Sequence, residues 1–503
     1  MQTSESRIGI KLKDLDFPQH IIQIAAMSSG FWSRLKEHSK MVHLLSASSF
    51  LIFLSISSTF QSAIPPQSPF GDALEAIFSV GVRLQTLLTD SNKDGPQNFL
   101  VSPLSVSLLI SQLMLGADKE LRQELYNLLS LPKAENTHHS LIYYHGSKKN
   151  TTFYLPYAKF HSQMGNLVRS LETKLVSKSF TLNCSNGLFI NSNFRLKENF
   201  EHNLEIYQTE IQPLNFSTDP LKSQQVINDW ANEQTRGVIK SIISTPLPPS
   251  TAAIFTNAIY FKAQWKTPFS FERNVFDSFS STATKTVKVE YMQESLTDIM
   301  YVNSDRLGCT AIRLPYIDNE VAMYFILPHV NNGEEHNIKK FSERLTIKEF
   351  IDLLSEMKAS SVTVKIPKLK LANSLSVLDP LERYRFFNKI ARKMTNEDGY
   401  KDSFDILEER IKMFNNLASL GKIDVDLNEA VEDSKLKVSN LIQQVHLSVD
   451  EKGTEAAAIS ASIIEYIGGS KLFILNRPFA FMVRHESTSA VLFWGTVSDP
   501  SSP

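Results

Sequence analysis

A run of small side chains near the C-terminus limits what this chain can fold into more than any other feature. Residues 451–462 read EKGTEAAAISAS. If the run is extended, its side chains alternate between two faces. One face then carries only small residues, which are Thr454, Ala456, Ala458, Ser460 and Ser462. Such a segment fits between two existing strands, because its inward face needs little room.

The resting state of this run stays open from the window alone. Alanine and serine are weak strand formers, which favours an exposed loop held out of a sheet. Gly453 then supplies a hinge, since glycine accepts unusual backbone angles. Alanine is also the best helix former, so an alanine-rich helix fits residues 451–462 about as well.

The segments downstream remove much of this ambiguity. Residues 463–470 (IIEYIGGS) read as an exposed linker, and residues 472–479 (LFILNRPF) as an apolar strand ending in Asn-Arg-Pro-Phe. This order resembles the hinge, reactive-centre loop and C-terminal signature of the serpin family. The 27 positions from Glu451 to Pro478 match the spacing of a full-length inhibitory loop in that family.

Other segments carry the same resemblance in the same order. They are residues 98–106 (NFLVSPLSV), 186–189 (NGLF), 227–230 (INDW), 235–239 (TRGVI) and 256–265 (TNAIYFKAQW). The resemblance implies an α+β fold, in which one large domain at residues 70–499 has mixed helices around three β-sheets and an exposed reactive-centre loop. Length alone, at 503 residues, would allow two or three domains.

The resemblance implies a protease inhibitor that is cleaved as a suicide substrate and inserts its loop into the main sheet. The hinge residues that match the family are Glu451, Gly453, Thr454, Ala456, Ala457 and Ala458. Family spacing places the scissile bond between Ile467 and Gly468, which favours elastase-like targets. A shift of one residue, to the bond between Tyr466 and Ile467, favours chymotrypsin-like targets instead. The absence of Arg and Lys between residues 453 and 470 disfavours trypsin-like targets.

The resemblance also assigns residues that control opening of the main sheet. Ser102, Ser105 and Asn186 match polar positions beneath it, and Trp265 matches the tryptophan at the point of loop entry. Gln443 stands where the family usually has a histidine. Glutamine keeps a donor and an acceptor but does not titrate, so we expect a sheet that opens with weaker pH sensitivity. Plain core packing explains the same residues.

Composition and charge exclude several classes of protein. The net charge of −1 gives no reason to expect a nucleic-acid partner. The two cysteines, Cys184 and Cys309, are too few for a disulfide framework and favour two separate thiols over a bridge. No Gly-X-Ser-X-Gly or His-Glu-X-X-His motif is present, which argues against a hydrolase. We expect no cofactor, no metal site and a monomer.

The N-terminal part of the sequence indicates export. Residues 41–63 resemble a signal peptide, with basic residues before a short, serine-rich apolar run. Residues 1–40 precede it and read as an extension of doubtful reality; an uncleaved membrane anchor is the alternative. Three sequons support a secreted, extracellular glycoprotein, at Asn150, Asn215 and, least favourably, Asn183 beside an expected strand.

Two regions depart from the resemblance and read as inserts. Residues 133–165 contain His138, His139 and His145, but no Cys or carboxylate pattern accompanies them, which favours a solvated loop over a metal site. Residues 382–403 carry a group of basic residues, which are Arg383, Arg385, Lys389, Arg392 and Lys393. A solvated surface segment is the simple interpretation, and a docking patch for a glycosaminoglycan is the sharper one. A non-inhibitory serpin that acts as a carrier, storage or binding protein stays the alternative function.

Overall fold

The computed structural model describes a part of the chain that forms one unit. The described ranges are residues 68–89, 98–131, 141–144, 151–174, 180–330, 347–382, 424–432, 435–454 and 470–502, with residues 338, 341, 345, 384 and 385. Helices and three hydrogen-bonded sheets make up these ranges, so the α+β prediction is confirmed. Residues 1–40 and the predicted signal segment lie outside the described residues.

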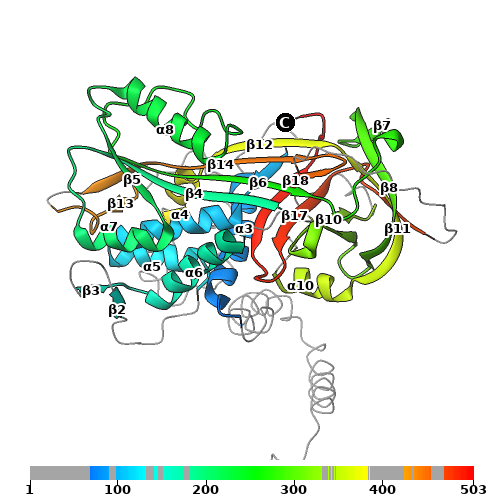
Figure 1. Cartoon of the computed structure of the whole chain (residues 1–503), viewed down its shortest axis with the longest axis horizontal. Coiled ribbons are helices and arrows are strands. Elements are labelled where there is room, and N and C mark those ends of the chain that lie inside the picture. The colour runs from blue at the N-terminus through cyan, green and yellow to red at the C-terminus, as the bar shows by residue number, and fades with distance from the viewer. Residues whose placement is uncertain are drawn as a thin grey trace, which may run out of the picture. The chain divides into compact units, whose positions relative to one another are not determined.

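A seven-stranded sheet has the strand order β12–β14–β6–β4–β5, with β13 paired to β14 and β15 paired to β6. Strands β6 and β14 are parallel neighbours, whereas the short β15 runs antiparallel to β6. Figure 1 shows these long strands crossing the unit side by side. The bounds are β4 Phe180–Asn191, β5 Glu210–Leu214, β6 Ala253–Gln264, β12 Leu369–Ser376, β13 Asp426–Leu427, β14 Leu436–Val449 and β15 Gly453–Thr454.

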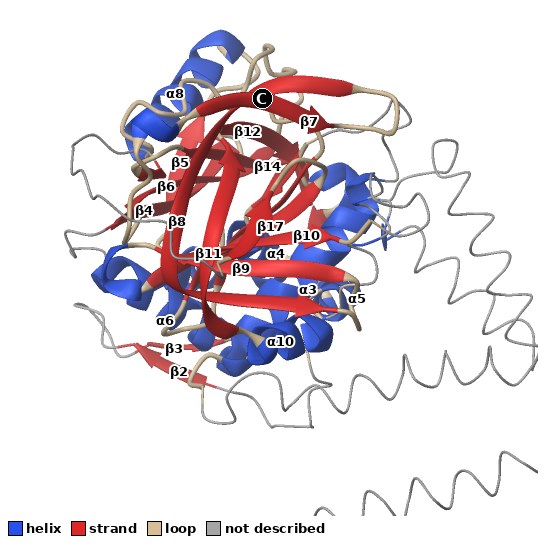
Figure 2. Ribbon diagram, turned by 90° about the vertical axis from the view of Figure 1, so that its right-hand side faces the viewer, coloured by secondary structure: helices blue, strands red, loops and turns tan. Residues whose placement is uncertain are grey.

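A nine-stranded sheet has the order β1–β18–β17–β10–β9–β8–β11–β16, with β7 paired to β8. Figure 2 shows how strongly β8 and β11 curve. The third sheet is the hairpin of β2 and β3, in the predicted insert. The bounds are β1 Phe99–Val101, β2 Leu141–Tyr144, β3 Thr151–Tyr154, β7 Val275–Ser280, β8 Thr286–Ser304, β9 Cys309–Pro315, β10 Val321–Pro328, β11 Lys358–Pro367, β16 Lys471–Ile474, β17 Phe479–His485 and β18 Val491–Val497.

Helices cover both faces of the seven-stranded sheet (Figure 1). Helix α4 contacts β6 and β14 on one face, and all of its residues are buried. Helix α8 covers the other face, over a separate small core that includes Phe189 and Trp230. The bounds are α3 Gly71–Thr89, α4 Pro103–Gly116, α5 Lys119–Leu128, α6 Ala158–Lys174, α7 Glu198–Leu204, α8 Pro220–Gln234 and α10 Ile347–Glu356, with 3-10 turns at Glu205–Tyr207, Phe271–Arg273 and Ile317–Asn319.

The start of α4 shows how the sequence builds the layer beneath the sheet. Ser102 caps this helix, because its side chain accepts a hydrogen bond from the Ser105 backbone amide at 3.2 Å. Pro103 follows as the first helical residue, where its missing N–H leaves no donor unpaired. The two predicted serines are therefore fixed at the helix end that meets β14.

The structure describes a part of each predicted insert. Residues 158–165 belong to helix α6, and Phe160 and Met164 there are buried in the core. Glu382 is also buried, and Arg385 donates to Glu124 Oε2 at 2.8 Å with only 12% of its side chain exposed. Arg385 is thus an internal ion-pair partner, and its place in an exposed basic patch was wrong. Its fixed partner is a helix α5 carboxylate that a sequence pattern does not reveal.

The rest of these inserts lies outside the described residues, including His138, His139 and His145 and the basic residues Arg383, Lys389, Arg392 and Lys393. Cys184 in β4 and Cys309 in β9 are both buried and are not joined in a disulfide, which confirms two separate thiols. Among the helices that the structure describes, none combines the length and the apolar character needed to cross a membrane.

Candidate functional site

The chain reverses direction between β14 and β15, and this turn sets the entry point of the predicted loop. Asp450 Oδ1 accepts hydrogen bonds from the backbone amides of Lys452, at 2.9 Å, and Gly453, at 3.2 Å. Gly453 has φ +145°, and a Cβ atom there would lie 2.1 Å from the Ala263 carbonyl oxygen. Only glycine fits this position, because it alone has no Cβ and accepts such an angle.

Two of the predicted hinge residues, Gly453 and Thr454, already lie in the sheet. Gly453 pairs with Gln264 and Thr454 with Ala263, both on β6. The Thr454 side chain is fully buried, and its hydroxyl lies 2.8 Å from the Tyr316 hydroxyl. Of the resting states left open for this run, neither an exposed loop nor a helix describes Gly453 and Thr454, which form the short strand β15. The reason is that β6 extends past its last pair with β14, which leaves its edge free to take a partner at this end.

Trp265 holds the hinge turn from below. Its backbone amide donates to the Lys452 carbonyl at 2.9 Å, and its indole Nε1 donates to the Asp450 carbonyl at 2.9 Å. The indole also stacks on the Tyr316 ring, with centroids 4.5 Å apart and an interplanar angle of 6°. A donor and a flat apolar face are what a buried tryptophan uses to fix a neighbour. The turn is thus held by side-chain and backbone contacts together.

Glu451 anchors the same turn through charge. Its side chain is 1% exposed, lies 3.0 Å from Lys368 Nζ and accepts a hydrogen bond from Asn274. Burial acts to raise the pKa of the Glu451 carboxyl, but the hydrogen bond from Asn274 and the charge of Lys368 outweigh it and hold the pKa below its usual value. The ionised form is therefore the one that the folded turn favours.

A polar row crosses the middle of the sheet. Gln443 on β14 lies opposite Asn257 on β6, which lies opposite Asn186 on β4. Asn257 Nδ2 donates to Asn186 Oδ1 at 2.9 Å, which helix α4 also reaches through Gln112 Nε2 at 3.2 Å. Asn186 Nδ2 in turn donates to the Tyr207 carbonyl at 2.9 Å. These hydrogen bonds between buried amides persist only while the strands keep their register.

Gln443 connects this row to the end of helix α4. Its Oε1 accepts from the Ser102 backbone amide at 3.1 Å, and its Nε2 donates to the Ser102 carbonyl at 2.7 Å. Both groups are buried. One glutamine therefore satisfies a backbone donor and a backbone acceptor, a role that uses both ends of its amide.

Two described residues flank the predicted loop: Thr454 in β15, and Ser470, whose hydroxyl lies 2.7 Å from Thr363 Oγ1 on β11. Strand β16 then pairs in parallel with β11. The 15 residues between these anchors, 455–469, lie outside the described residues. They include Ala456, Ala457, Ala458, Tyr466, Ile467 and Gly468, so the scissile bond stays a prediction.

Sequence reasoning missed the partners of the residues that it named. They are Gln112, Asn257, Asn274, Tyr316 and Lys368. Asn257 and Gln112 each stand among mostly apolar residues, in β6 and in helix α4; an amide in such a run was a usable signal. Lys368 and Asn274 meet Glu451 only through the fold, and no local pattern announces them.

Comparisons with known proteins match this architecture. The family described as Serpin (serine protease inhibitor) matches residues 76–500. The chain belongs to the serpin family. Leukocyte elastase inhibitor of Xenopus laevis is 26% identical over 424 residues, which cover 82% of this chain and 95% of that protein. These relatives are protease inhibitors rather than enzymes, in agreement with the prediction.

Solved structures agree on the fold. A thyroxine-binding globulin in complex with thyroxine has a TM-score of 0.65 at 22% identity, covering 85% of this chain and 99% of that one. Human glycosylated kallistatin has a TM-score of 0.62 at 26% identity, covering 86% of this chain and 99% of that one. The predicted serpin fold is confirmed.

Proposed function

We propose that this serpin is a secreted inhibitor of elastase-like or chymotrypsin-like serine proteases, and that it acts by inserting its cleaved loop between β6 and β14. The observation that carries the proposal is the pairing of Gly453 and Thr454 with β6. Continuing that antiparallel register would place residues 453–464 along all 12 residues of β6. The small face of the run would then point to the same side as Thr454, toward the buried layer.

Hydrogen-bond geometry supplies a driving force for this insertion. Strands β6 and β14 are parallel neighbours, and their pairing begins at Tyr260 opposite His446. An antiparallel strand between them would replace one parallel ladder with two antiparallel ladders, which are slightly more stable per residue. In the continued register Ala457 lies opposite Tyr260, so insertion past Ala457 requires β6 and β14 to part.

The chemistry belongs to the target protease. Its serine attacks the carbonyl of Ile467, the peptide bond to Gly468 breaks, and Ile467 becomes an ester on the enzyme. Cleavage leaves Gly468 as a new amino terminus on the segment that leads to β16. The segment from the hinge to Ile467 is then free at its end and can insert. Hydrolysis of the ester would release an active protease, so trapping requires that insertion outruns deacylation. An apolar residue at the scissile position suits a hydrophobic primary pocket, and an elastase inhibitor among the relatives supports this class of target.

Incubation with pancreatic elastase, chymotrypsin and trypsin, followed by denaturing gels, tests this function. We expect a covalent complex with one of the first two enzymes and none with trypsin. Mass spectrometry of the released C-terminal peptide identifies the bond: a peptide beginning at Gly468 supports Ile467, and one beginning at Ile467 supports Tyr466. Loop cleavage without any stable complex would contradict inhibition and favour the carrier or binding class.

Secretion is part of the proposal and rests on the apolar segment at residues 41–63 and on the sequons. Asn215 is exposed just after β5, whereas Asn183 donates its amide to the Gln234 carbonyl at 3.1 Å within β4. Of the two sequons that the structure describes, Asn215 is therefore the favoured glycosylation site. Asn150 lies outside the described residues. N-terminal sequencing of secreted protein tests cleavage near residue 63; a mature chain that starts before Met41 would contradict it. Loss of a glycan mass in Ser217→Ala tests Asn215.

A further inference from the structure

His161, in helix α6, is linked to the polar row of the seven-stranded sheet through one residue, Tyr207. The His161 side chain is 1% exposed, and its Nδ1 shares a hydrogen bond with the Tyr207 hydroxyl in the 3-10 turn at Glu205–Tyr207. The two rings meet edge to face, with centroids 5.9 Å apart and an interplanar angle of 80°. Tyr207 is itself fully buried. The helix and the turn are thus joined by a polar contact that is sealed from solvent.

Tyr207 carries this contact on to the sheet. Its backbone carbonyl accepts the hydrogen bond from Asn186 Nδ2 at 2.9 Å. The helix and the turn are also packed closely, since a Cβ atom at Gly165 of α6 would lie 2.6 Å from Ile206 Cγ2 and 2.7 Å from the Ile206 carbonyl oxygen. A close-packed interior transmits such displacements. A movement of α6 would therefore reach Asn186 through Tyr207.

The surroundings of His161 favour a neutral ring. Burial and the positive charge of Arg122, on α5, lower the pKa of His161 to about 3. Arg122 is itself paired with Glu429, at 2.7 Å, and among the described residues the His161 ring forms no ion pair. The elements around α6 carry further ionisable groups, which are Asp72 and Glu75 on α3, Tyr126 on α5, Cys184 on β4 and Glu205 in the 3-10 turn. A proton on His161 would thus lie near a cation without a counter-ion of its own.

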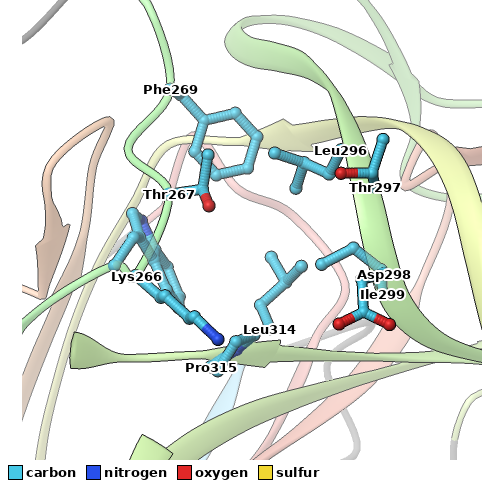
Figure 3. Close-up of a pocket in the computed structure, with 10 residues that line it drawn as sticks. Lys266, Thr267, Phe269, Leu296, Thr297, Asp298, Ile299, Leu314 and Pro315 are labelled. Carbon is cyan, nitrogen blue, oxygen red and sulfur yellow. The ribbon is translucent and has the colours of Figure 1, made fainter. Parts of the chain in front are cut away.

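Burial separates His161 from the charged groups near the hinge. There, Lys266 and Asp298 are exposed at the rim of a pocket of about 240 Å³ beside Trp265 (Figure 3). A group that already contacts water gains little hydration when a sheet opens, whereas a buried imidazole gains much. The amides of the polar row do not titrate at all. His161 is therefore a group through which acid can act on this row.

We propose that His161 is a positioning residue for loop insertion: the neutral ring holds Tyr207 and Asn186 in place, and its protonation in mild acid loosens them, so that β6 and β14 part more readily. This rests on the proposed insertion between those strands. A state in which α6 has moved exposes the imidazole, which then takes up a proton near its ordinary pKa of about 6.5. The stability that neutral His161 contributes is complete above that pH and falls as the pH drops toward 3. Acid is thus expected to speed opening although Gln443 does not titrate.

Uptake of a labelled synthetic peptide with the sequence of residues 455–464 tests this on the intact protein without a protease. For the parent, we expect uptake at about pH 5.5 to be several-fold, and at most about tenfold, faster than at about pH 7.5. His161→Gln keeps a hydrogen-bonding amide but does not titrate, so its rate should be the same at both pH values. His161→Phe offers Tyr207 no partner and should take up the peptide fast at both.

His446→Gln is the matched control, because His446 lies where the pairing of β6 and β14 begins. We expect it to keep the response of the parent to pH. Urea denaturation at the same two pH values reports the buried neutral ring separately: on acidification, the unfolding equilibrium of the parent should shift about tenfold more than that of His161→Gln.

The proposal is overturned by no uptake at either pH, by an equal pH response of the parent and His161→Gln, or by loss of the response in His446→Gln instead. A tenfold difference in unfolding without any difference in uptake also overturns it, because His161 would then be a buried residue with no hold on the sheet. Covalent trapping of protease at about pH 7.5 reports the proposed function independently of all these outcomes.

Discussion

Two regions of the seven-stranded sheet differ in how they are built: the hinge end of β6, where the loop would enter, and the centre, where β6 and β14 pair. At the entry point, β15 already occupies the edge of β6, and Trp265, Lys368 and Asn274 hold the turn before it. At the centre, β6 and β14 are paired directly, and Gln443 and Asn257 belong to the buried polar row. In the proposed mechanism, insertion would therefore start without separating strands and become costly only past Tyr260. The comparison predicts that entry-point changes act on insertion and turn stability, whereas central changes act on the barrier to opening.

The largest effect is expected from Thr454→Arg at the entry point. The Thr454 side chain is fully buried beside Tyr316 already in the intact protein, so an arginine there would hold β15 off β6, and the inserted strand would then have to bury an unpaired charge, which costs several kcal/mol. Each 1.4 kcal/mol is about tenfold, so we expect at least a 100-fold fall in the ratio of trapped to released protease. Densitometry of the covalent complex on denaturing gels measures it.

Glu455→Arg is the matched control, because residue 455 falls on the opposite face of the inserted strand. We expect it to trap protease nearly as well as the parent. If Thr454→Arg also traps protease as well as the parent, the small face of the run does not enter the sheet.

The next effect is expected from Lys368→Met. This change leaves the Glu451 carboxylate, 1% exposed, with Asn274 but without its counter-charge. Breaking a fully buried pair costs about 3–5 kcal/mol; since Lys368 is 33% exposed, we expect roughly 2–3 kcal/mol in the free energy of unfolding. Urea denaturation measures the loss. The exposed control Lys370→Met is expected to change stability by less than about 0.5 kcal/mol, and equal losses in the two variants would remove Lys368 from the account.

Gly453→Ala separates backbone strain from steric contact. Its Cβ would meet the Ala263 oxygen at 2.1 Å, whereas a Cβ at Gly237, which also has positive φ, meets nothing within 4 Å. We expect a loss of roughly 2–3 kcal/mol for Gly453→Ala and about 1 kcal/mol for Gly237→Ala. The first variant alone should increase amide hydrogen exchange at Thr454. Equal losses and unchanged exchange would mean that the close approach to β6 is unimportant.

The smallest effect is expected at the centre, from Gln443→Leu. The backbone amide and carbonyl of Ser102 would each lose a buried partner, at about 1–3 kcal/mol in total. Because this loosens the joint between α4 and β14, insertion should become faster even as the native state loses stability. Stopped-flow trapping rates and urea denaturation measure the two quantities. Gln444→Leu, on the neighbouring residue of β14, is the control, and slower trapping in Gln443→Leu would reverse the assigned role of the centre.

The sequence predicted the residues that lie in the chain's own motifs and missed those that the fold brings to them. The hinge run, Trp265 and Gln443 could be named from the sequence because each sits in a segment with a recognisable order, and their functional roles stay predictions. Lys368 and Asn274 were not found, since they lie about 80 and 180 positions before Glu451 and no periodicity connects them. The prediction of an exposed Arg385 was wrong for the same reason. A basic residue in a charged run is expected to be exposed, and only the fold shows that its partner Glu124 lies beside it.

The sequence also could not predict how many hinge residues pair with β6 in the intact protein. Small alternating residues indicate that the run fits a sheet, but not how much of it is paired at rest. The free end of β6 and the space that only Gly453 fits decide this, and both depend on the register between β6 and β14.

Thermal unfolding of the protein before and after cleavage of its loop tests the central claim most directly. The account predicts that the cleaved protein, with residues 453–464 inserted between β6 and β14, melts more than about 10 °C above the intact one, well beyond the roughly 2–4 °C that a change of 1 kcal/mol produces in a domain of 150–250 residues. A midpoint that stays the same or falls after cleavage would contradict insertion into this sheet.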